Sequence, residues 1–367
     1  MAFYHALKKY KKQPDPNYPK KASWIASRLL TLRHDLFHVI KKERQPNSLI
    51  IGSWNIRAFD NGVLRMDESY HYIAEIIDHF DICAIQEVKK DLGPLRRLVK
   101  LIGPNWDFFV SDVSIHKGGN NERMAFVFNK NRVRFRNLIG EIVLPKETLI
   151  DGEQVARSPF FASFQAGWFK FSLCSAHIIY GNDLKMRAAE IKSVADILVK
   201  RAKTEDQVHI FLGDMNIEKK DDEVMQALKD SKLTAPDFGP TNMGSNRWFD
   251  QMAFTTKGKS GNKTRLLRHG TFDWRHSVFG PHPSQDAPAL TAEDLAAGKY
   301  RPTAKETLNH YEQKVINIRK NHGKAPYANW PKSYKNWTTY EMSDHLPIWM
   351  ELEIDYSDDY LRRFLKR

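Results

Sequence analysis

The stretch V-H-I-F-L-G-D-M-N, residues 208–216, joins a run of apolar residues to polar side chains that follow it directly. A nearly continuous apolar run is typical of a strand that is buried on both faces of its sheet. Polar groups just beyond such a strand lie at the rim of the sheet, where crevices form. Asp214 and Asn216 are two residues apart, so an extended backbone points both side chains the same way. The stretch therefore predicts a covered sheet with chemistry at its edge.

Other predicted strands also carry polar groups at one end. L-I-I-G-S-W-N ends at Asn55, I-C-A-I-Q-E ends at Glu87, and the last strand opens with Asp344 and His345. Hard oxygen ligands suit Mg²⁺, which binds through one or two carboxylates, waters and substrate phosphate. We expect Glu87 to be the first ligand of a magnesium ion and Asn55 the second, with Mn²⁺ as the other ion that such oxygen donors accept.

Apolar residues at helical spacing alternate with short apolar runs along the chain. The predicted helices span residues 22–44, 66–80, 92–102, 182–203 and 303–320. The predicted strands span residues 49–54, 82–85, 123–129, 133–143, 159–166, 168–176, 208–212, 249–254 and 346–354. So many strands with so few helices predict an α/β fold in which two packed sheets have helices outside.

The charge of the chain is uneven. The formal net charge is +13, and residues 1–48 carry 11 Lys and Arg against 3 Asp and Glu, while residues 257–340 carry 15 against 6. The rest of the chain is slightly acidic. Two basic segments favour a polyanionic partner, most commonly nucleic acid. A solvated basic surface that only aids solubility would give the same counts.

Composition excludes several other classes of protein. Hydrophobic residues make up 41% of the 367, which excludes a disordered chain. No run of 18 apolar residues occurs, so we expect no membrane span and no membrane partner. The start, M-A-F-Y-H-A-L-K-K, does not have the order of a signal peptide. Cys83 and Cys174 lie in apolar runs, which indicates buried thiols in a reducing compartment. We expect a cytoplasmic monomer.

A set of short motifs occurs in a characteristic order: S-W-N-I-R, A-I-Q-E-V, A-F-V-F-N-K, R-S-P-F, S-A-H-I-I-Y-G, F-L-G-D-M-N-I, F-D-Q-M-A-F and S-D-H-L-P-I. The set resembles the endonuclease/exonuclease/phosphatase superfamily, which includes pancreatic deoxyribonuclease and exonuclease III. The resemblance covers roughly residues 48–254 and 338–356. It implies a four-layer sandwich of two packed, mainly antiparallel mixed sheets flanked by helices. It also implies Mg²⁺-dependent cleavage of phosphoester bonds.

The resemblance further implies roles for single residues. Glu87, with Asn55 nearby, resembles the metal-binding pair, and Asp344 matches an acid that makes a further metal or water contact. Asp214 matches the acid that polarises the attacking water. Asn216 matches the amide that positions this water and the phosphate.

Two histidines and an arginine complete the implied site. His345 resembles the histidine that contacts the scissile phosphate, with Asp250 of F-D-Q-M as its carboxylate partner. Asp273 of G-T-F-D-W-R-H competes for that role. His177 stands where deoxyribonuclease-like members carry histidine, whereas abasic-site endonucleases of the exonuclease III type usually carry tyrosine. Arg157 of R-S-P-F resembles a phosphate-contacting arginine. An imidazole held by a carboxylate has a raised pKa, which favours the cation against a phosphate.

The patterns divide the chain into parts. Residues 1–47 are expected to form a basic extension with a helix, and residues 48–356 the catalytic domain. A basic insertion occupies residues 255–340, and residues 357–367 form a C-terminal tail. The insertion begins as a glycine-rich loop and later interleaves aromatic with basic residues in Y-A-N-W-P-K-S-Y-K-N-W. This mix suits stacking on unpaired bases, but packing of the insertion onto the domain is the slightly favoured explanation for most of these aromatics.

The leading hypothesis is a Mg²⁺-dependent nuclease that hydrolyses phosphodiester bonds of nucleic acid, with DNA favoured and with weak sequence preference. The basic segments would hold backbone phosphates beyond the cut, which would make binding steeply salt-dependent. The alternative is a phosphatase or phosphodiesterase for inositol phosphates or phospholipids, because the same core serves both. A non-catalytic nucleic-acid-binding scaffold is a third hypothesis, and the complete set of site residues argues against it.

Overall fold

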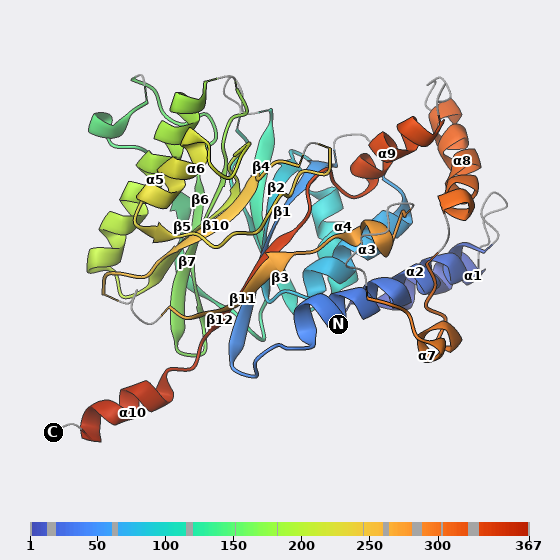
Figure 1. Cartoon of the computed structure of the whole chain (residues 1–367), viewed down its shortest axis with the longest axis horizontal. Coiled ribbons are helices and arrows are strands. Elements are labelled where there is room, and N and C mark those ends of the chain that lie inside the picture. The colour runs from blue at the N-terminus through green and yellow to red at the C-terminus, as the bar shows by residue number, and fades with distance from the viewer. Residues whose placement is uncertain are drawn as a thin grey trace.

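The centre of the computed structural model consists of two sheets of six strands each (Figure 1). The structure describes residues 2–12, 20–60, 65–114, 120–150, 152–181, 183–244, 246–259, 264–280, 288–301, 304–321 and 330–365. The strands are β1 (Ser48–Phe59), β2 (Ile82–Lys89), β3 (Trp106–Val110), β4 (Glu122–Asn129), β5 (Arg134–Glu141), β6 (Phe160–Ala166), β7 (Phe169–His177), β8 (Val208–Asp214), β9 (Leu233–Thr234), β10 (Asp250–Thr255), β11 (Leu266–Thr271) and β12 (Ile348–Glu353).

The two sheets are mixed and mainly antiparallel. Their strand orders are β11-β12-β1-β2-β4-β3 and β5-β6-β7-β8-β10-β9. The neighbours β1 and β2 run parallel, as do β7 and β8, and the other neighbouring strands run antiparallel. Parallel neighbours bring their carboxyl ends to one edge, and these two pairs build the candidate site.

Helices cover the outer faces of both sheets. They are α1 (Leu7–Lys12), α2 (Lys21–Leu36), α3 (Asp67–Asp78), α4 (Gly93–Ile102), α5 (Leu184–Thr204), α6 (Glu223–Asp230), α7 (Ala292–Ala296), α8 (Ala304–Asn321), α9 (Trp330–Glu341) and α10 (Ser357–Leu365). A π-helical turn, Phe37–Lys41, continues α2. None of the described helices is long and apolar enough to cross a membrane.

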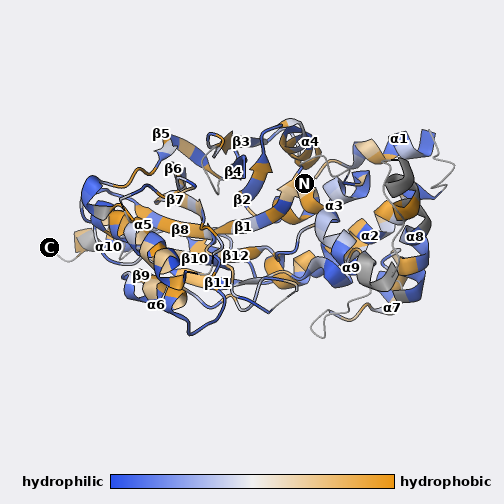
Figure 2. Cartoon of the chain, turned by 90° about the horizontal axis from the view of Figure 1, so that it is seen from above, coloured by the Kyte–Doolittle hydropathy of each residue, from blue (hydrophilic) through white to orange (hydrophobic). Residues whose placement is uncertain are grey.

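Three apolar clusters divide the molecule into four layers. One cluster lies between the two sheets. A second packs α2, α3 and α4 on the outer face of the first sheet, and a third packs α5 and α6 on the outer face of the second. Figures 1 and 2 show α5 and α6 beside one sheet, the helices α1–α4 and α7–α9 beyond the other, and α10 set apart near the C-terminus. The predicted four-layer sandwich is confirmed.

The alternation of side chains along the strands explains which way the site residues point. In β1, Leu49 and Ile51 belong to the cluster between the sheets, whereas Ile50 belongs to the helix side. Because side chains alternate with a period of two, Asn55 further along β1 also points between the sheets. Asp214 at the end of β8 follows the same rule. Two strands in different sheets thus direct polar groups at each other.

Some predicted boundaries are wrong, and some elements were missed. The predicted helix 22–44 is α2 plus the π-helical turn, which ends at Lys41. The missed elements are β3, β9, β11, α1, α6, α7, α9 and α10. Within segment 255–340, β11 pairs with β12 and is therefore part of the first sheet. Residues 260–263 of the predicted glycine-rich loop lie outside the described residues.

The aromatic residues late in segment 255–340 pack inward where the structure describes them. Tyr334 and Trp337 of α9 are buried in the cluster on the outer face of the first sheet. Tyr327 and the side chains of Trp330 and Lys332 lie outside the described part of the chain. For Tyr334 and Trp337, packing rather than stacking on bases is the correct explanation.

Candidate active site

The ends of four strands meet at one edge of the two sheets. In the register of the parallel pairs, Asn55 stands beside Gln86, and His177 stands beside Asp214. Asp250 opens the antiparallel β10, directly opposite Asp214. Strand pairing thus gathers polar residues within each sheet, and the packing of the two sheets brings both groups to one place.

Gly213 allows the close approach of β7 and β8 at this edge. Its φ is +129°, and an added Cβ would lie 2.0 Å from the carbonyl oxygen of Ala176. Only glycine accommodates both the positive φ and the contact. The glycine of the G-D-M-N motif thus serves to bring Asp214 against the end of β7.

Asp214 lies at the centre of the site. Its Oδ2 accepts a hydrogen bond of 2.8 Å from Nδ2 of Asn55, and its Oδ1 accepts one of 2.9 Å from the backbone N–H of Asn216. The Nε2 atoms of His177 and His345 lie 3.6 and 3.8 Å from the same Oδ2. Two imidazoles and one amide therefore converge on one carboxylate oxygen, which is buried.

His345 is held by a buried carboxylate, as the sequence predicts. Its Nδ1 lies 2.7 Å from Oδ2 of Asp250, and Thr241 donates to that same oxygen at 2.6 Å. Burial acts to lower the pKa of His345, but Asp250 and Asp214 outweigh it and raise the pKa well above its ordinary value. The competing candidate Asp273 instead binds Arg275. The two carboxylates therefore favour the charged form of His345.

His177 has a carboxylate partner that the sequence did not reveal. Its Nδ1 lies 3.2 Å from Oε2 of Glu122, close enough for an ion pair but without the alignment of a hydrogen bond. Arg157 lies 3.4 Å from the same oxygen and donates to the carbonyl of His177 at 3.1 Å. Burial acts to raise the pKa of Glu122, yet His177, Arg157 and Lys89 lower it to about 2.

The hydroxyl of Ser343, which precedes Asp344 and His345, links two segments of the site. Its Oγ donates to the carbonyl of Asn55 at 2.6 Å and accepts from the backbone N–H of His345 at 3.0 Å. The serine thus ties the end of β1 to the segment that carries His345. Only its place at the start of S-D-H hinted at this role.

Three predicted residues have other contacts than the resemblance implies. Asn216 donates from Nδ2 to the carbonyl of Ile178 at 2.6 Å. Arg157 is buried against Glu122, so its contact with a substrate phosphate stays a prediction. Asp344 is partly exposed, 4.0 Å from Arg57, and its contact with a metal also stays a prediction.

Two residues at this edge have oxygen atoms of the kind that ligate a hard divalent cation. Oδ1 of Asn55 is buried and has no hydrogen-bond partner among the described residues. Glu87 comes directly after Gln86, the residue of β2 that pairs with Asn55. Its Oε2 accepts a hydrogen bond of 2.7 Å from the backbone N–H of Ala58. The described residues contain no cluster of three or more His, Cys, Asp or Glu that could hold a metal ion. An amide oxygen and one carboxylate fit Mg²⁺, which keeps several waters.

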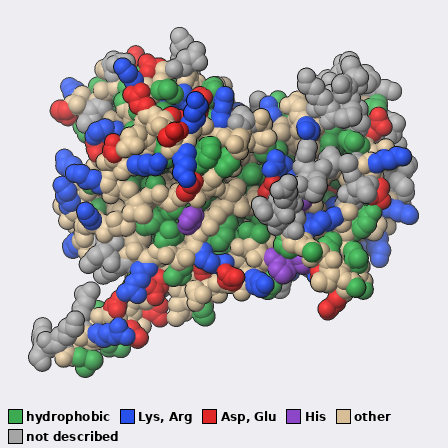
Figure 3. Space-filling view, viewed as in Figure 1, with side chains coloured by type: hydrophobic (Ala, Val, Ile, Leu, Met, Phe, Trp, Pro, Cys, Tyr) green, Lys and Arg blue, Asp and Glu red, His purple; other side chains and the backbone are tan. Residues whose placement is uncertain are grey.

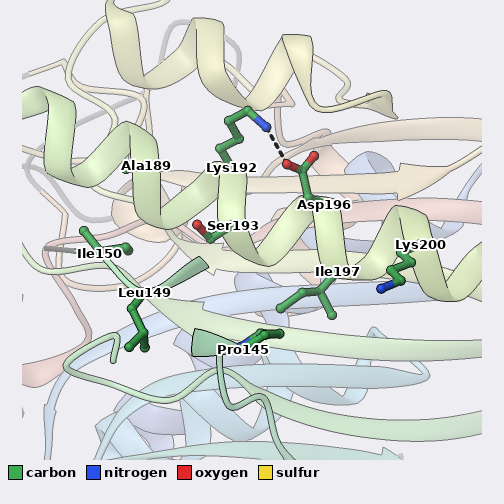
Figure 4. A pocket seen from close by; sticks show the side chains of 9 residues that line it. All are labelled: Pro145, Leu149, Ile150, Ala189, Lys192, Ser193, Asp196, Ile197 and Lys200. Carbon is green, nitrogen blue, oxygen red and sulfur yellow. Dashed lines mark hydrogen bonds and ion pairs between the residues drawn. The ribbon is translucent and has the colours of Figure 1, made fainter. Parts of the chain in front are cut away.

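A groove elsewhere on the molecule is unrelated to these residues. It has a volume of about 510 Å³ and lies between α5 and residues 145–150 (Figure 4). Its lining includes Leu149, Ile150 and Ile197, with the ion pair of Lys192 and Asp196 at its rim. None of the predicted site residues lines it, so the candidate site is recognised by its convergent polar groups.

Two comparisons of the sequence with known proteins give matches. The model of the Endonuclease/Exonuclease/phosphatase family matches residues 52–287. Deoxyribonuclease-1 of Equus caballus is 27% identical over 183 residues, which cover 46% of this chain and 61% of that protein. The match thus spans about three fifths of the relative's length.

Solved structures share the fold at low identity. An endonuclease/exonuclease/phosphatase family protein from Bacteroides thetaiotaomicron has a TM-score of 0.51 at 16% identity, over 85% of this chain and 97% of that one. A mannosyl-6-phosphatase from the same organism has a TM-score of 0.50 at 15% identity, over 83% and 99%. At these identities the two structures show the fold alone.

Proposed function

Because the chain belongs to the endonuclease/exonuclease/phosphatase family, we propose that it is a divalent-metal-dependent nuclease that hydrolyses phosphodiester bonds of DNA. The observation that carries the proposal is the convergence of His177, His345 and Asn55 on Oδ2 of Asp214. A phosphodiester is an anion, and its hydrolysis needs a base for water and cations for the phosphate. The site has both within a few ångströms.

Each residue has a task that follows from its contacts. Asp214 orients the attacking water and accepts its proton, because a general base must lie within hydrogen-bond reach of that proton. His345, a cation held by Asp250, stabilises negative charge on the phosphate oxygens. His177, on the other side of Asp214, provides a hydrogen bond or a proton near the leaving oxygen.

Asn55 and Glu87 would hold the Mg²⁺ ion at this edge. When bound, the ion would neutralise the phosphate and stabilise the leaving oxygen. The free Oδ1 of Asn55 supports this role, because a buried amide oxygen without a partner is costly unless something binds it.

Charge and sequence relatives favour DNA as the substrate. The net charge of +13 suits a polyanion, and Figure 3 shows Lys and Arg spread over both halves of one face among acidic residues. Such a distribution suits contacts to a phosphate backbone rather than to bases. The horse relative is a deoxyribonuclease by name, and His177 stands where the resemblance places histidine in deoxyribonuclease-like members.

Purified protein on supercoiled plasmid, linear duplex, single-stranded DNA and RNA, with Mg²⁺ and with EDTA, tests the proposal. We expect Mg²⁺-dependent nicking of DNA and none in EDTA. Turnover of inositol phosphates or other phosphomonoesters without any nick would support the alternative, a phosphatase.

The variant Glu87→Gln tests the metal assignment. We expect a loss of about 10²–10³-fold in the cleavage rate, with unchanged secondary structure by circular dichroism. The matched control is Glu43→Gln, because Glu43 is exposed on the segment before β1. Unchanged Mg²⁺-dependent cleavage by Glu87→Gln would show that the metal is held elsewhere.

A further inference from the structure

A second polar pocket lies at the opposite end of the first sheet. It has a volume of about 520 Å³, and its lining includes Lys41, Arg44, Asp81 and Arg132. The carbonyl of Ser48, the first residue of β1, accepts hydrogen bonds from two of them. At about 3.3 Å per residue, the seven steps from Ser48 to Asn55 span roughly 23 Å. The pocket is therefore separate from the candidate active site.

Two arginines in this pocket are held in place by shared acceptors. Arg44 and Arg132 both donate to the carbonyl of Ser48, at 3.0 and 2.7 Å, and both pair with the buried Asp81, at 2.6 and 3.3 Å. These contacts use Nη2 of Arg44, and Nε and Nη2 of Arg132. A guanidinium has five N–H donors, so each arginine keeps donors for a ligand. Their orientation is set before any ligand arrives, which lowers the entropic cost of binding.

Lys41 adds a third cation. Among the described residues, none of the hydrogen bonds or ion pairs found involves its ammonium group. Burial, together with the charges of Arg44 and Arg132, lowers the pKa of Lys41 from 10.5 to about 8 against the opposing effect of Asp81 and Asp78. An anion bound beside the ammonium group would raise this pKa again.

The neighbouring surface is basic as well. A second hollow shares Arg132 and includes Lys130 and Arg134, which lie on and just after the turn between β4 and β5. The carboxylates that line the first pocket are those of Asp78 and Asp81. Cations thus outnumber carboxylates three to two in the first pocket, and the adjoining turn adds two more.

We propose that this pocket is a second anion site that binds a phosphate group, either as free phosphate or as the terminal phosphate of a nucleotide or an oligonucleotide. Two planar guanidinium forks and one ammonium point charge are the donor set that phosphate oxygens prefer. The site is independent of the proposed nuclease activity, because it shares no residue with it.

Competitive acylation of Lys41 tests the site directly. The full chain is treated with a trace of acetic anhydride at pH 8 in EDTA, and the modified lysines are mapped by mass spectrometry. A bound phosphate that raises the pKa of Lys41 by one unit should slow its acylation about fivefold. The adjacent, exposed Lys42 is the internal control and should react at an unchanged rate. Chloride at equal ionic strength should protect neither lysine.

The probes are inorganic phosphate, ADP, and an oligonucleotide with and without a 5′-phosphate. Protection by any phosphate-bearing probe supports the proposal and identifies the source of the phosphate. Protection by none of them, or equal protection by the unphosphorylated oligonucleotide, overturns it.

The variant Arg132→Lys keeps the charge but removes the guanidinium fork. We expect it to weaken the protection of Lys41 at a fixed phosphate concentration, while the thermal unfolding midpoint confirms that the variant is folded. Protection equal to that of the unchanged protein would show that the arginine pair does not bind the anion, and the proposal would be wrong.

Discussion

The two carboxylate–imidazole pairs on either side of Asp214 make the same kinds of contact but differ in distance and alignment. In each pair, Nε2 of the histidine is directed to Oδ2 of Asp214 and Nδ1 to a buried carboxylate. The pair of His345 and Asp250 is an aligned hydrogen bond of 2.7 Å. The pair of His177 and Glu122 is longer and less well aligned, and Arg157 shares its carboxylate.

Because of this difference, the charge and the orientation of the two imidazoles are fixed to different degrees. His345 has a dedicated partner, which Thr241 holds in turn, so its charge and orientation are set. His177 shares Glu122 with Arg157 and Lys89, so the negative charge beside it is partly neutralised by other cations. We infer that His345 acts as a permanent cation and that His177 is the better candidate for moving a proton.

Removing the charge of Asp250 should have the largest effect. Asp250→Asn takes away the strongest cause of the raised pKa of His345, and burial then lowers that pKa. We expect kcat at pH 7.5 to fall by about 10²–10⁴-fold. Residual activity should rise as the pH falls, because acid restores the imidazolium. Steady-state kinetics between pH 5 and 8 would measure both effects.

The matched control for this variant is Asp273→Asn, since Asp273 is the other carboxylate that the sequence offered as a partner of His345. It binds Arg275 instead, so we expect no change in kcat or in its pH dependence. A larger loss in Asp273→Asn than in Asp250→Asn would reverse the assignment of the pair.

Breaking the second pair should cost less. Glu122→Gln keeps the shape of the side chain but removes a charge that three cations share. Interactions with a charged group are on the order of 1.5–3 kcal/mol, which corresponds to a fall in kcat of about 10- to 150-fold. Single-turnover kinetics on DNA would measure it. A loss as large as that of Asp250→Asn would mean that the two pairs are equivalent, against the difference in their geometry.

The fold was largely predictable because most of its strands are short, strongly apolar runs. Buried strands such as β8 and amphipathic helices such as α5 have clear periods. β11 lacks that signal, since R-L-L-R-H-G-T lies at the edge of its sheet and leaves its side chains half-exposed or exposed. α9 was missed because its aromatic and basic residues fit both packing and stacking.

The candidate site was predictable where a polar residue directly follows an apolar run. Asn55, Glu87 and Asp214 all satisfy this pattern. Glu122 is instead the first residue of its strand. Its partner His177 is brought to it by the packing of one sheet on the other, which the local sequence does not encode. Thr241 lies in a loop where its hydroxyl has no distinctive neighbour in the chain.

A substitution of Glu190 in α5 should have the smallest effect on catalysis, but it should clearly change stability. Oε1 of Glu190 is buried without a partner among the described residues. Burial raises its pKa from 4.5 to about 7, against the opposing effect of Arg157 and His177. The folded state therefore binds the proton more tightly than the unfolded chain. The contribution to stability is complete below pH 4.5 and is lost as the pH rises towards 7.

Glu190→Gln removes this titration. The free energy of unfolding of the variant, relative to the unchanged protein, should rise between pH 4.5 and pH 7 by on the order of 2–3 kcal/mol. Denaturant unfolding at several pH values would measure the difference. Asp196→Asn on the exposed side of the same helix is the control and should show a much smaller trend, because Asp196 is largely exposed. A flat difference for Glu190→Gln would mean that this carboxylate is ionised at little cost. The second imidazole pair would then have a charged neighbour that further distinguishes it from the pair of His345 and Asp250.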